Sequence, residues 1–337
     1  MKALVMHGPG SIRVNDVPLP ARKVGEALLQ VRYVGLCGTD LSSYRGRNPL
    51  VSYPRIPGHE IAATIVEIDD DSSNLSVGAA VTLSPYTSCG KCAACRNRRS
   101  NACQFNQTLG VQRDGALAEY ISVPLEKLYP VRLGLRELSL VEPLTVGCHA
   151  VARARVTDAD TVAIFGCGGV GLGAVAASAF RGGRTIAIDV DDGKLEIAKK
   201  AGAAYTINSQ TQDLGSVLSA LTEKLGPQVV IEAVGRPETF VAAVERVAYT
   251  GRVVYIGYAK EPVTYETKLF VQKELDIMGT RNALPENFRE VIQMLEAGTF
   301  PVDDMISAVV PMHEAPEQLR QWDQRPGEIT KILVKVS

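Results

Sequence analysis

The stretch TVAIFGCGGVG, residues 161–171, decides the fold of the second half of the chain. An apolar run typical of a strand leads into a glycine-rich turn, and the helical stretch VGLGAVAASAF, residues 170–180, follows directly. Glycines spaced in this way permit a tight bend, the approach of a pyrophosphate to the backbone, and close packing of the helix. The helix N-terminus offers unpaired N–H groups to an anion. The candidate dinucleotide contacts are Gly166, Gly168, Gly169, Val170 and Gly171.

The end of the next apolar strand, RTIAIDV (184–190), carries Asp189. A carboxylate at this position accepts hydrogen bonds from both ribose hydroxyls and repels a 2′-phosphate. The residues that follow, Val190, Asp191 and Asp192, provide no arginine that would reverse this preference. The pattern therefore predicts NAD rather than NADP, with a glycine turn that serves only the topology as the alternative.

The chain has two regions with different sequence patterns. Short alternating runs at 27–34, 61–68, 79–83 and 116–123 predict a β-rich, barrel-like domain, whereas from about residue 150 apolar strands alternate with helical stretches. Such alternation predicts a parallel, doubly wound sheet. We expect a helix near 287–298, and a last strand at 331–336 that returns to the first domain. The predicted domains are 150–287 for the cofactor, and 1–149 with 288–337 for the chemistry.

Composition restricts the classes of function. The chain has 337 residues, of which 46% are hydrophobic, which suffices for about two domains with their own cores. A formal net charge of −1 offers no basic field for nucleic acid. No long uninterrupted apolar run is present. We expect a cytoplasmic protein that binds neither nucleic acid nor a membrane.

Four cysteines lie close together in CGKCAACRNRRSNAC, residues 89–103. The spacing of Cys89, Cys92, Cys95 and Cys103 is that of a closed, tetrahedral zinc site, which has a structural role. A pair of disulfides is the alternative, although such short loops strain a disulfide. The lobe at 86–106 has few apolar side chains, so a metal ion would supply much of its stability.

The first domain offers further metal-ligating residues. They are Cys37 in GLCGTD, His59 and Glu60 in PGHE, and Glu142 in VEPLTVG. One thiolate, one imidazole and one carboxylate leave a fourth position of a tetrahedral ion open for water or a substrate oxygen. Each residue taken alone could instead be a small core residue, a loop histidine or a solvated carboxylate, and spacing alone does not bring them together.

The motifs CGTD, GHE and EP, the four-cysteine lobe and GxGGVG, in this order, resemble the zinc-dependent medium-chain dehydrogenases, the alcohol and sorbitol dehydrogenase family. The resemblance covers essentially the whole chain. It implies an α/β protein with a GroES-like β-barrel catalytic domain and a Rossmann cofactor domain, two zinc ions per chain and NAD. It also implies a homodimer or homotetramer.

Within this resemblance the catalytic zinc ligands fall on Cys37 and His59, with Glu142 ranked ahead of Glu60 as the carboxylate. Thr39 matches the hydroxyl that hands on the substrate proton, and Asp40 matches the acid that orients the zinc-bound imidazole. Alternatively, Thr39 and Asp40 only cap a helix that starts at residue 41. The implied reaction oxidises a secondary alcohol to a ketone in the cleft between the domains, with hydride passing to the nicotinamide.

The segments 44–60, 110–124 and 279–288 are similar to the branch that oxidises sugar acids, the L-galactonate and L-gulonate 5-dehydrogenases. Guanidinium groups could hold a carboxylate, and the candidates are Arg45, Arg47, Arg55 and Arg281, the last beside Asn282. Alternatively these arginines are solvated, or Arg281 contacts the cofactor. The other functions considered are a neutral polyol (sorbitol or galactitol type) or L-threonine dehydrogenase, and a non-enzymatic NAD-binding sensor or scaffold. The zinc-free reductases of the superfamily lack the Cys, His and Glu set.

Overall fold

The computed structural model describes residues 1–69, 75–325, 327 and 329–337. The chain forms two units, Met1–Glu142 with Val302–Ser337, and Pro143–Pro301. The helix α3 (Leu135–Arg153) spans the division, and Pro143, which has no N–H to donate, lies inside it at that point. Within the described ranges, no helix has both the length and the apolar character that a membrane span requires.

The first unit is built around β3 (Glu26–Leu36), in which buried and half-buried residues largely alternate. This strand pairs antiparallel with β4, β6 and β15, and the sheet has the order β14-β15-β3-β4-β5-β7. Its remaining elements are β1 (Lys2–Gly8), β2 (Ser11–Asp16), α1 (Gly38–Tyr44), β4 (Glu60–Glu67), β5 (Ala80–Leu83), α2 (Ala93–Arg96), η1 (Ser100–Ala102), β6 (Tyr120–Pro124), η2 (Leu125–Lys127), β7 (Leu128–Pro130), α10 (Val302–Met305), β14 (Ala308–Pro311), α11 (Ala315–Gln324) and β15 (Ile332–Lys335).

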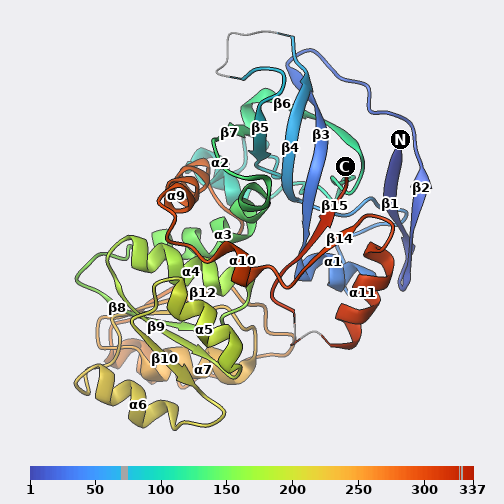
Figure 1. Cartoon of the computed structure of the whole chain (residues 1–337). Helices are drawn as coiled ribbons and strands as arrows, with labels where there is room; N and C mark the ends of the chain where they lie inside the picture. Colours follow the sequence, from blue (N-terminus) through green and yellow to red (C-terminus); the bar gives the residue numbers. More distant parts are fainter. Residues whose placement is uncertain (70–74, 326, 328) are drawn as a thin grey trace. The chain divides into compact units, whose positions relative to one another are not determined.

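The last strand returns to the first unit, as the sequence predicted. Val334 of β15 pairs with Val34 of β3, so the red end of the chain lies beside the blue strand in Figure 1. The buried side chains Leu319 and Trp322 of α11 join the same core. The C-terminal segment is therefore an integral part of this unit.

The second unit contains a parallel sheet with the order β10-β9-β8-β11-β12-β13. This is the doubly wound order, in which the order of the strands across the sheet reverses between the first and fourth strands, β8 and β11. Both of these strands are almost entirely buried, as expected where helices cover both faces. The elements are β8 (Thr161–Phe165), α4 (Gly169–Phe180), β9 (Arg184–Asp189), α5 (Asp192–Lys200), β10 (Tyr205–Asn208), α6 (Leu214–Leu221), β11 (Val229–Glu232), α7 (Pro237–Arg246), β12 (Arg252–Tyr255), α8 (Lys268–Gln272), β13 (Asp276–Gly279) and α9 (Pro285–Glu296).

The predicted fold class, a GroES-like β domain with a Rossmann-type sheet, is confirmed. The division differs in position, since residues 143–149 and 288–301 belong to the second unit. Helix α9 is held there by a salt bridge of 2.6 Å from Arg181 to Glu290 and by a 2.9 Å contact between His149 and Asn287. These long-range contacts have no counterpart in the local sequence pattern.

Candidate functional site

Three of the predicted ligands converge in the first unit. Cys37 is the N-cap of α1, Glu60 is the first residue of β4, and His59 directly precedes it. One ligand atom from each of the three lies within 4.8 Å of the others. His59 and Glu60 are buried, at 5% and 1% exposure. The fold therefore brings the thiol of Cys37 to an imidazole and a carboxylate from a later segment of the chain.

Asp40 connects the two segments that carry these ligands. One of its carboxylate oxygens accepts the N–H of Cys37 at 2.9 Å, and the other accepts the N–H of Gly58 at 3.3 Å. Asp40 therefore connects the backbone on both sides of the site, and its role in orienting the imidazole stays a prediction. The helix also begins at Gly38 rather than at residue 41, because Asp40 caps it from its third position.

Glu60 is paired with a lysine that the sequence analysis did not identify. The Nζ atom of Lys331 donates to both Glu60 oxygens, at 2.6 and 2.7 Å, and to the carbonyl of Leu36 at 3.3 Å. A Cβ atom on Gly35 would lie 2.0 Å from a Glu60 oxygen, so a glycine is needed at that position. Lys331 directly precedes β15, and no local motif relates it to the site.

Glu142 has a different partner. The buried hydroxyl of Tyr86 donates a hydrogen bond to its carboxylate. Burial raises the pKa of Tyr86 well above its ordinary value, and the charge of Glu142 adds to this shift. The phenol therefore remains protonated and remains a donor. The sequence analysis did not identify Tyr86 either, because nothing in the sequence around it relates it to Glu142.

The electrostatics of His59 fit a metal ion. Burial alone would lower its pKa, but the negative charges of Cys37, Asp40 and Glu142 raise it well above the ordinary value. Its Nδ1 atom is buried and lacks a hydrogen-bond partner among the residues that the structure describes. A buried, unsatisfied nitrogen among anionic groups suits a cation with nitrogen and sulfur ligands, as zinc is. Thr39 lies beside this group, with its hydroxyl 3.6 Å from the sulfur of Cys37.

The four cysteines of the lobe also converge, with their sulfur atoms within 4.8 Å of one another. All seven cysteines of the chain are free, and the 3.9 Å between the sulfurs of Cys92 and Cys103 is far longer than a disulfide bond. Backbone N–H groups donate to the sulfurs, chiefly that of Cys95 to Cys92, and lower the pKa of Cys92 to about 6. Burial instead raises the pKa of Cys95 to about 11. The donor set fits a closed zinc site.

The glycine turn of the second unit lies at the carboxyl end of β8, where the sheet order reverses. Gly166 has a φ of +91°, and a Cβ atom on Gly171 would lie 1.8 Å from the carbonyl oxygen of Gly166. In contrast, a Cβ atom on Gly168, the N-cap of α4, would enter open space. Asp189 accepts the N–H of Cys167 at 2.6 Å, which fixes its carboxylate beside the turn. The arrangement fits a pyrophosphate and a ribose.

The candidate substrate-binding arginines differ in their surroundings and in their ion pairs. Arg45 pairs with Asp323, and Arg55 pairs with Asp114 at 3.0 Å. Arg47 is exposed, and Arg281 follows β13 at the carboxyl edge of the parallel sheet. Arg281 lies four strands from Asp189, which is roughly 19 Å at 4.8 Å per strand. Two of the guanidinium groups are thus already neutralised by carboxylates of the same unit.

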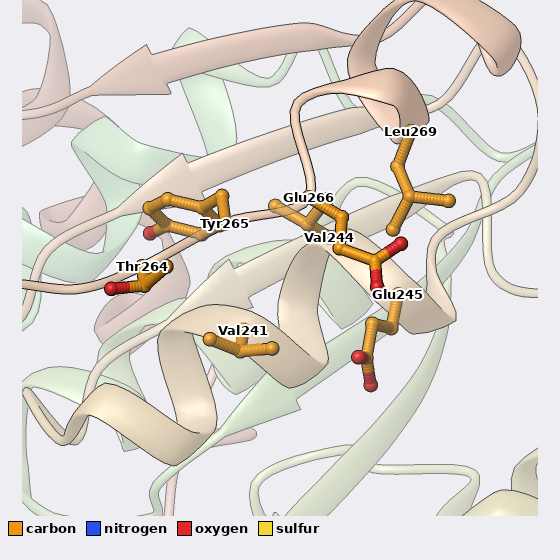
Figure 2. Close-up of a pocket in the computed structure, with 7 residues that line it drawn as sticks. All are labelled: Val241, Val244, Glu245, Thr264, Tyr265, Glu266 and Leu269. Atoms are coloured by element: carbon orange, nitrogen blue, oxygen red, sulfur yellow. The ribbon is translucent and has the colours of Figure 1, made fainter.

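A pocket of about 130 Å³ in the second unit lies between α7 and the segment 264–269 (Figure 2). No residue predicted for the site lines it. Its lining residues are Val241, Val244, Glu245, Thr264, Tyr265, Glu266 and Leu269. None of the candidate metal ligands or cofactor contacts therefore lines this pocket.

Comparison with known proteins gives consistent matches. Residues 23–132 match the alcohol dehydrogenase GroES-like domain, and residues 169–297 match the zinc-binding dehydrogenase family. The sorbitol dehydrogenase of Bacillus subtilis is 32% identical over 99% of this chain and 97% of its own length, and the L-galactonate-5-dehydrogenase of Escherichia coli is 31% identical over 91% of each. A crystal structure of the alcohol dehydrogenase rspB from Escherichia coli CFT073, complexed with NADH, superposes with a TM-score of 0.90 at 28% identity over 100% of this chain and 99% of that one. The chain belongs to the zinc-binding alcohol dehydrogenase family.

Proposed function

We propose that this protein is a zinc- and NAD-dependent dehydrogenase that oxidises a secondary alcohol of a polyol to a ketone. The observation that carries the proposal is the convergence of Cys37, His59 and Glu60 within 4.8 Å, in a buried and anionic environment. When bound, zinc supplies Lewis acidity that lowers the pKa of a substrate hydroxyl, and NAD supplies the hydride acceptor.

Cys37, His59 and Glu142 would hold the catalytic zinc. Glu60 is the alternative carboxylate, since its ligand atom lies within 4.8 Å of those of Cys37 and His59, and its oxygens also accept two hydrogen bonds from Lys331. The structural zinc would be held by Cys89, Cys92, Cys95 and Cys103.

The remaining residues of the site orient the metal ligands, transfer the substrate proton and bind the cofactor. Asp40 holds the backbone on both sides of the ligand pair, which fixes the separation of the thiolate and the imidazole. The hydroxyl of Thr39 accepts the proton of the substrate hydroxyl and passes it on. In the second unit Gly166, Gly168, Gly169, Val170 and Gly171 receive the pyrophosphate at the N-terminus of α4, and Asp189 accepts the ribose hydroxyls.

The pairing of Arg45 and Arg55 with Asp323 and Asp114 favours a neutral polyol over a sugar acid. A sugar acid is the second candidate. It is supported by the similarity to the L-galactonate-5-dehydrogenase, and Arg47 or Arg281 would hold its carboxylate.

We also propose a homo-oligomer. The strand β13 is an edge of the parallel sheet, and it carries the half-exposed Ile277, while Val271 nearby in sequence is 84% exposed. An edge strand with apolar side chains is a ready surface for pairing with a second copy. Sedimentation of the Ile277→Lys variant should show smaller particles than wild type, and unchanged particles would contradict this assignment.

Seven free cysteines also fit a reducing compartment, so we propose a cytoplasmic location. Fractionation of the producing cells tests this, and recovery outside the cytoplasm would overturn it.

The test of the function is NADH formation by the zinc-loaded protein with NAD and a panel of substrates. The panel contains sorbitol, galactitol, galactitol phosphate, L-galactonate, L-gulonate, L-threonine and simple secondary alcohols. Turnover with neutral polyols supports the proposal, and turnover confined to the aldonates supports the second candidate. Cys37→Ser should abolish turnover without unfolding the protein, whereas Cys148→Ser, at a buried cysteine outside the site, should retain it. No turnover with any substrate, despite bound NAD and two zinc ions, would favour an NAD-binding sensor or scaffold.

A further inference from the structure

Tyr86 stands between the two candidate metal sites of the first unit. Its buried side chain donates to Glu142, and its backbone lies three residues before Cys89, the first cysteine of the lobe. Tyr86 therefore links the backbone next to the lobe to the carboxylate of Glu142.

The backbone on both sides of the tyrosine is held by the segment that leaves the lobe. Before it, the carbonyl of Pro85 accepts the N–H of Leu109 at 3.1 Å. After it, the N–H of Thr87 donates to the side-chain oxygen of Asn106 at 3.1 Å, and the Thr87 hydroxyl accepts the N–H of Gln107 at 2.7 Å. The residues on both sides of the tyrosine, which follows β5, are thus bonded to residues 106–109.

The segment 106–109 is in turn fixed by the last cysteine. The N–H of Asn106 donates to the carbonyl of Cys103 at 3.1 Å, and the sulfur of Cys103 accepts the N–H groups of Cys89 and Phe105 at 3.3 and 3.4 Å. A continuous series of short contacts therefore leads from the four sulfurs through Asn106 and Thr87 to the tyrosine.

We infer that the four-cysteine lobe positions the carboxylate of Glu142 through Tyr86, so that metal in the lobe raises the affinity of the Cys37, His59 and Glu142 site for its own metal ion. This inference rests on the proposed function, because it takes Glu142 as a ligand. Tyr86 is then a positioning residue, and the lobe has a role beyond the stability of its own loop. Coupling of this kind is reciprocal, so metal at the second site also strengthens metal binding in the lobe.

The test is a titration of the reduced, metal-free protein with Co²⁺, followed by competition with Zn²⁺. Four thiolates and a single thiolate give cobalt spectra of different intensity, so the two sites are read separately. Loss of a residue that orients a ligand typically weakens metal binding by about 10- to 100-fold. We expect Tyr86→Phe to weaken the Cys37 site by about tenfold and to leave the lobe filled. Tyr53→Phe is the matched control, because it removes another phenol hydrogen bond in the same unit, to the carbonyl of Ser43, and should leave both affinities unchanged.

A double-mutant cycle tests the connection itself. Cys103→Ser should empty the lobe and weaken the Cys37 site, and it should add no further loss when Tyr86 is already Phe. Thr87→Val keeps all four thiols but removes the acceptor for Gln107, so it serves the same cycle if the cysteine variant does not fold.

The possible results distinguish a failure of this inference from a failure of the proposed function. The inference is overturned if Cys103→Ser or Thr87→Val lowers the metal affinity of the Cys37 site equally in the wild-type and the Tyr86→Phe background. It is also overturned if the Tyr86→Phe protein binds metal at both sites with wild-type affinity. In either case the second cobalt ion still binds, and the proposed function stands. A wild-type protein that binds cobalt only in the lobe overturns both.

Discussion

Replacement of Lys331 by Met should destabilise the first unit by about 3–5 kcal/mol, the usual cost of leaving one charge of a buried ion pair without its partner. The geometry supports the upper part of this range. The side chains of Lys331 and Glu60 are 5% and 1% exposed, both Glu60 oxygens lie within 2.7 Å of Nζ, and the carbonyl of Leu36 also loses a donor. Water cannot replace these bonds without opening the core.

The assay is urea unfolding of the zinc-free protein, followed by the fluorescence of Trp322. This is the single tryptophan of the chain, and it is buried in the core of the first unit, so its signal reports on that unit. Lys335→Met, at an exposed position of β15, is the matched control and should change the free energy of unfolding by less than about 0.5 kcal/mol. The double variant Lys331→Met with Glu60→Gln removes both charges and should recover most of the loss.

The pH dependence of the same measurement follows from the pKa of Lys331. Burial opposes its charge, but the negative charges of Glu60, Cys37 and Glu142 together outweigh burial and raise the pKa of Lys331 above the ordinary value of 10.5. A raised pKa means that the stabilisation is complete below pH 10.5 and is lost as the pH rises through the folded-state value. The difference between wild type and Lys331→Met should therefore be constant at neutral pH and shrink only in strong alkali. A Lys331→Met protein within about 1 kcal/mol of wild type at pH 7 would refute this reasoning.

Three further outcomes are expected. Gly35→Ala should lower the free energy of unfolding by about 1–3 kcal/mol in the same assay, because the added Cβ would lie 2.0 Å from a buried oxygen of Glu60. Gly8→Ala, whose Cβ would meet nothing within 4 Å, is the control, and equal losses of stability in the two variants would contradict the prediction. Asp189→Ala should weaken NAD binding by about tenfold and narrow the preference over NADP, as measured by cofactor titration, and a variant that still strongly prefers NAD would show that the ribose contact lies elsewhere. In metal-free protein at pH 7, iodoacetamide should label Cys92 before Cys95, because their pKa values are about 6 and about 11; peptide mass spectrometry that finds the reverse order would contradict the shifts.

Features of the fold with a local cause were predictable from the sequence. The glycine turn, the apolar strands and the helix after each strand follow from side-chain periodicity and turn chemistry. Boundaries set by distant partners were not predictable. The expected strand at 116–123 begins only at Tyr120, because the preceding residues pair with the first strand instead, with Leu117 accepting the N–H of Leu4 at 2.7 Å and Glu119 donating to Lys2 at 3.0 Å.

The same limit applies to the site. Short motifs identified the candidate ligands, since each motif carries its own residue type and turn. Their partners come from remote parts of the chain, as Lys331 does for Glu60 and Tyr86 does for Glu142. The arginine cluster shows the converse, because the sequence could not indicate that Arg45 is already paired with Asp323.

The charges of these partners explain why one buried site can hold so many anionic groups. The carboxylate of Asp40 is met by two backbone N–H groups, so it needs no cation. A thiolate with Glu60 and Glu142 carries three negative charges, and Lys331 reduces this to two, which a divalent zinc ion would neutralise. Without Lys331 the same site would keep one uncompensated charge when filled. Lys331 therefore sets the net charge of the metal site, so its removal should change the metal affinity as well as the stability.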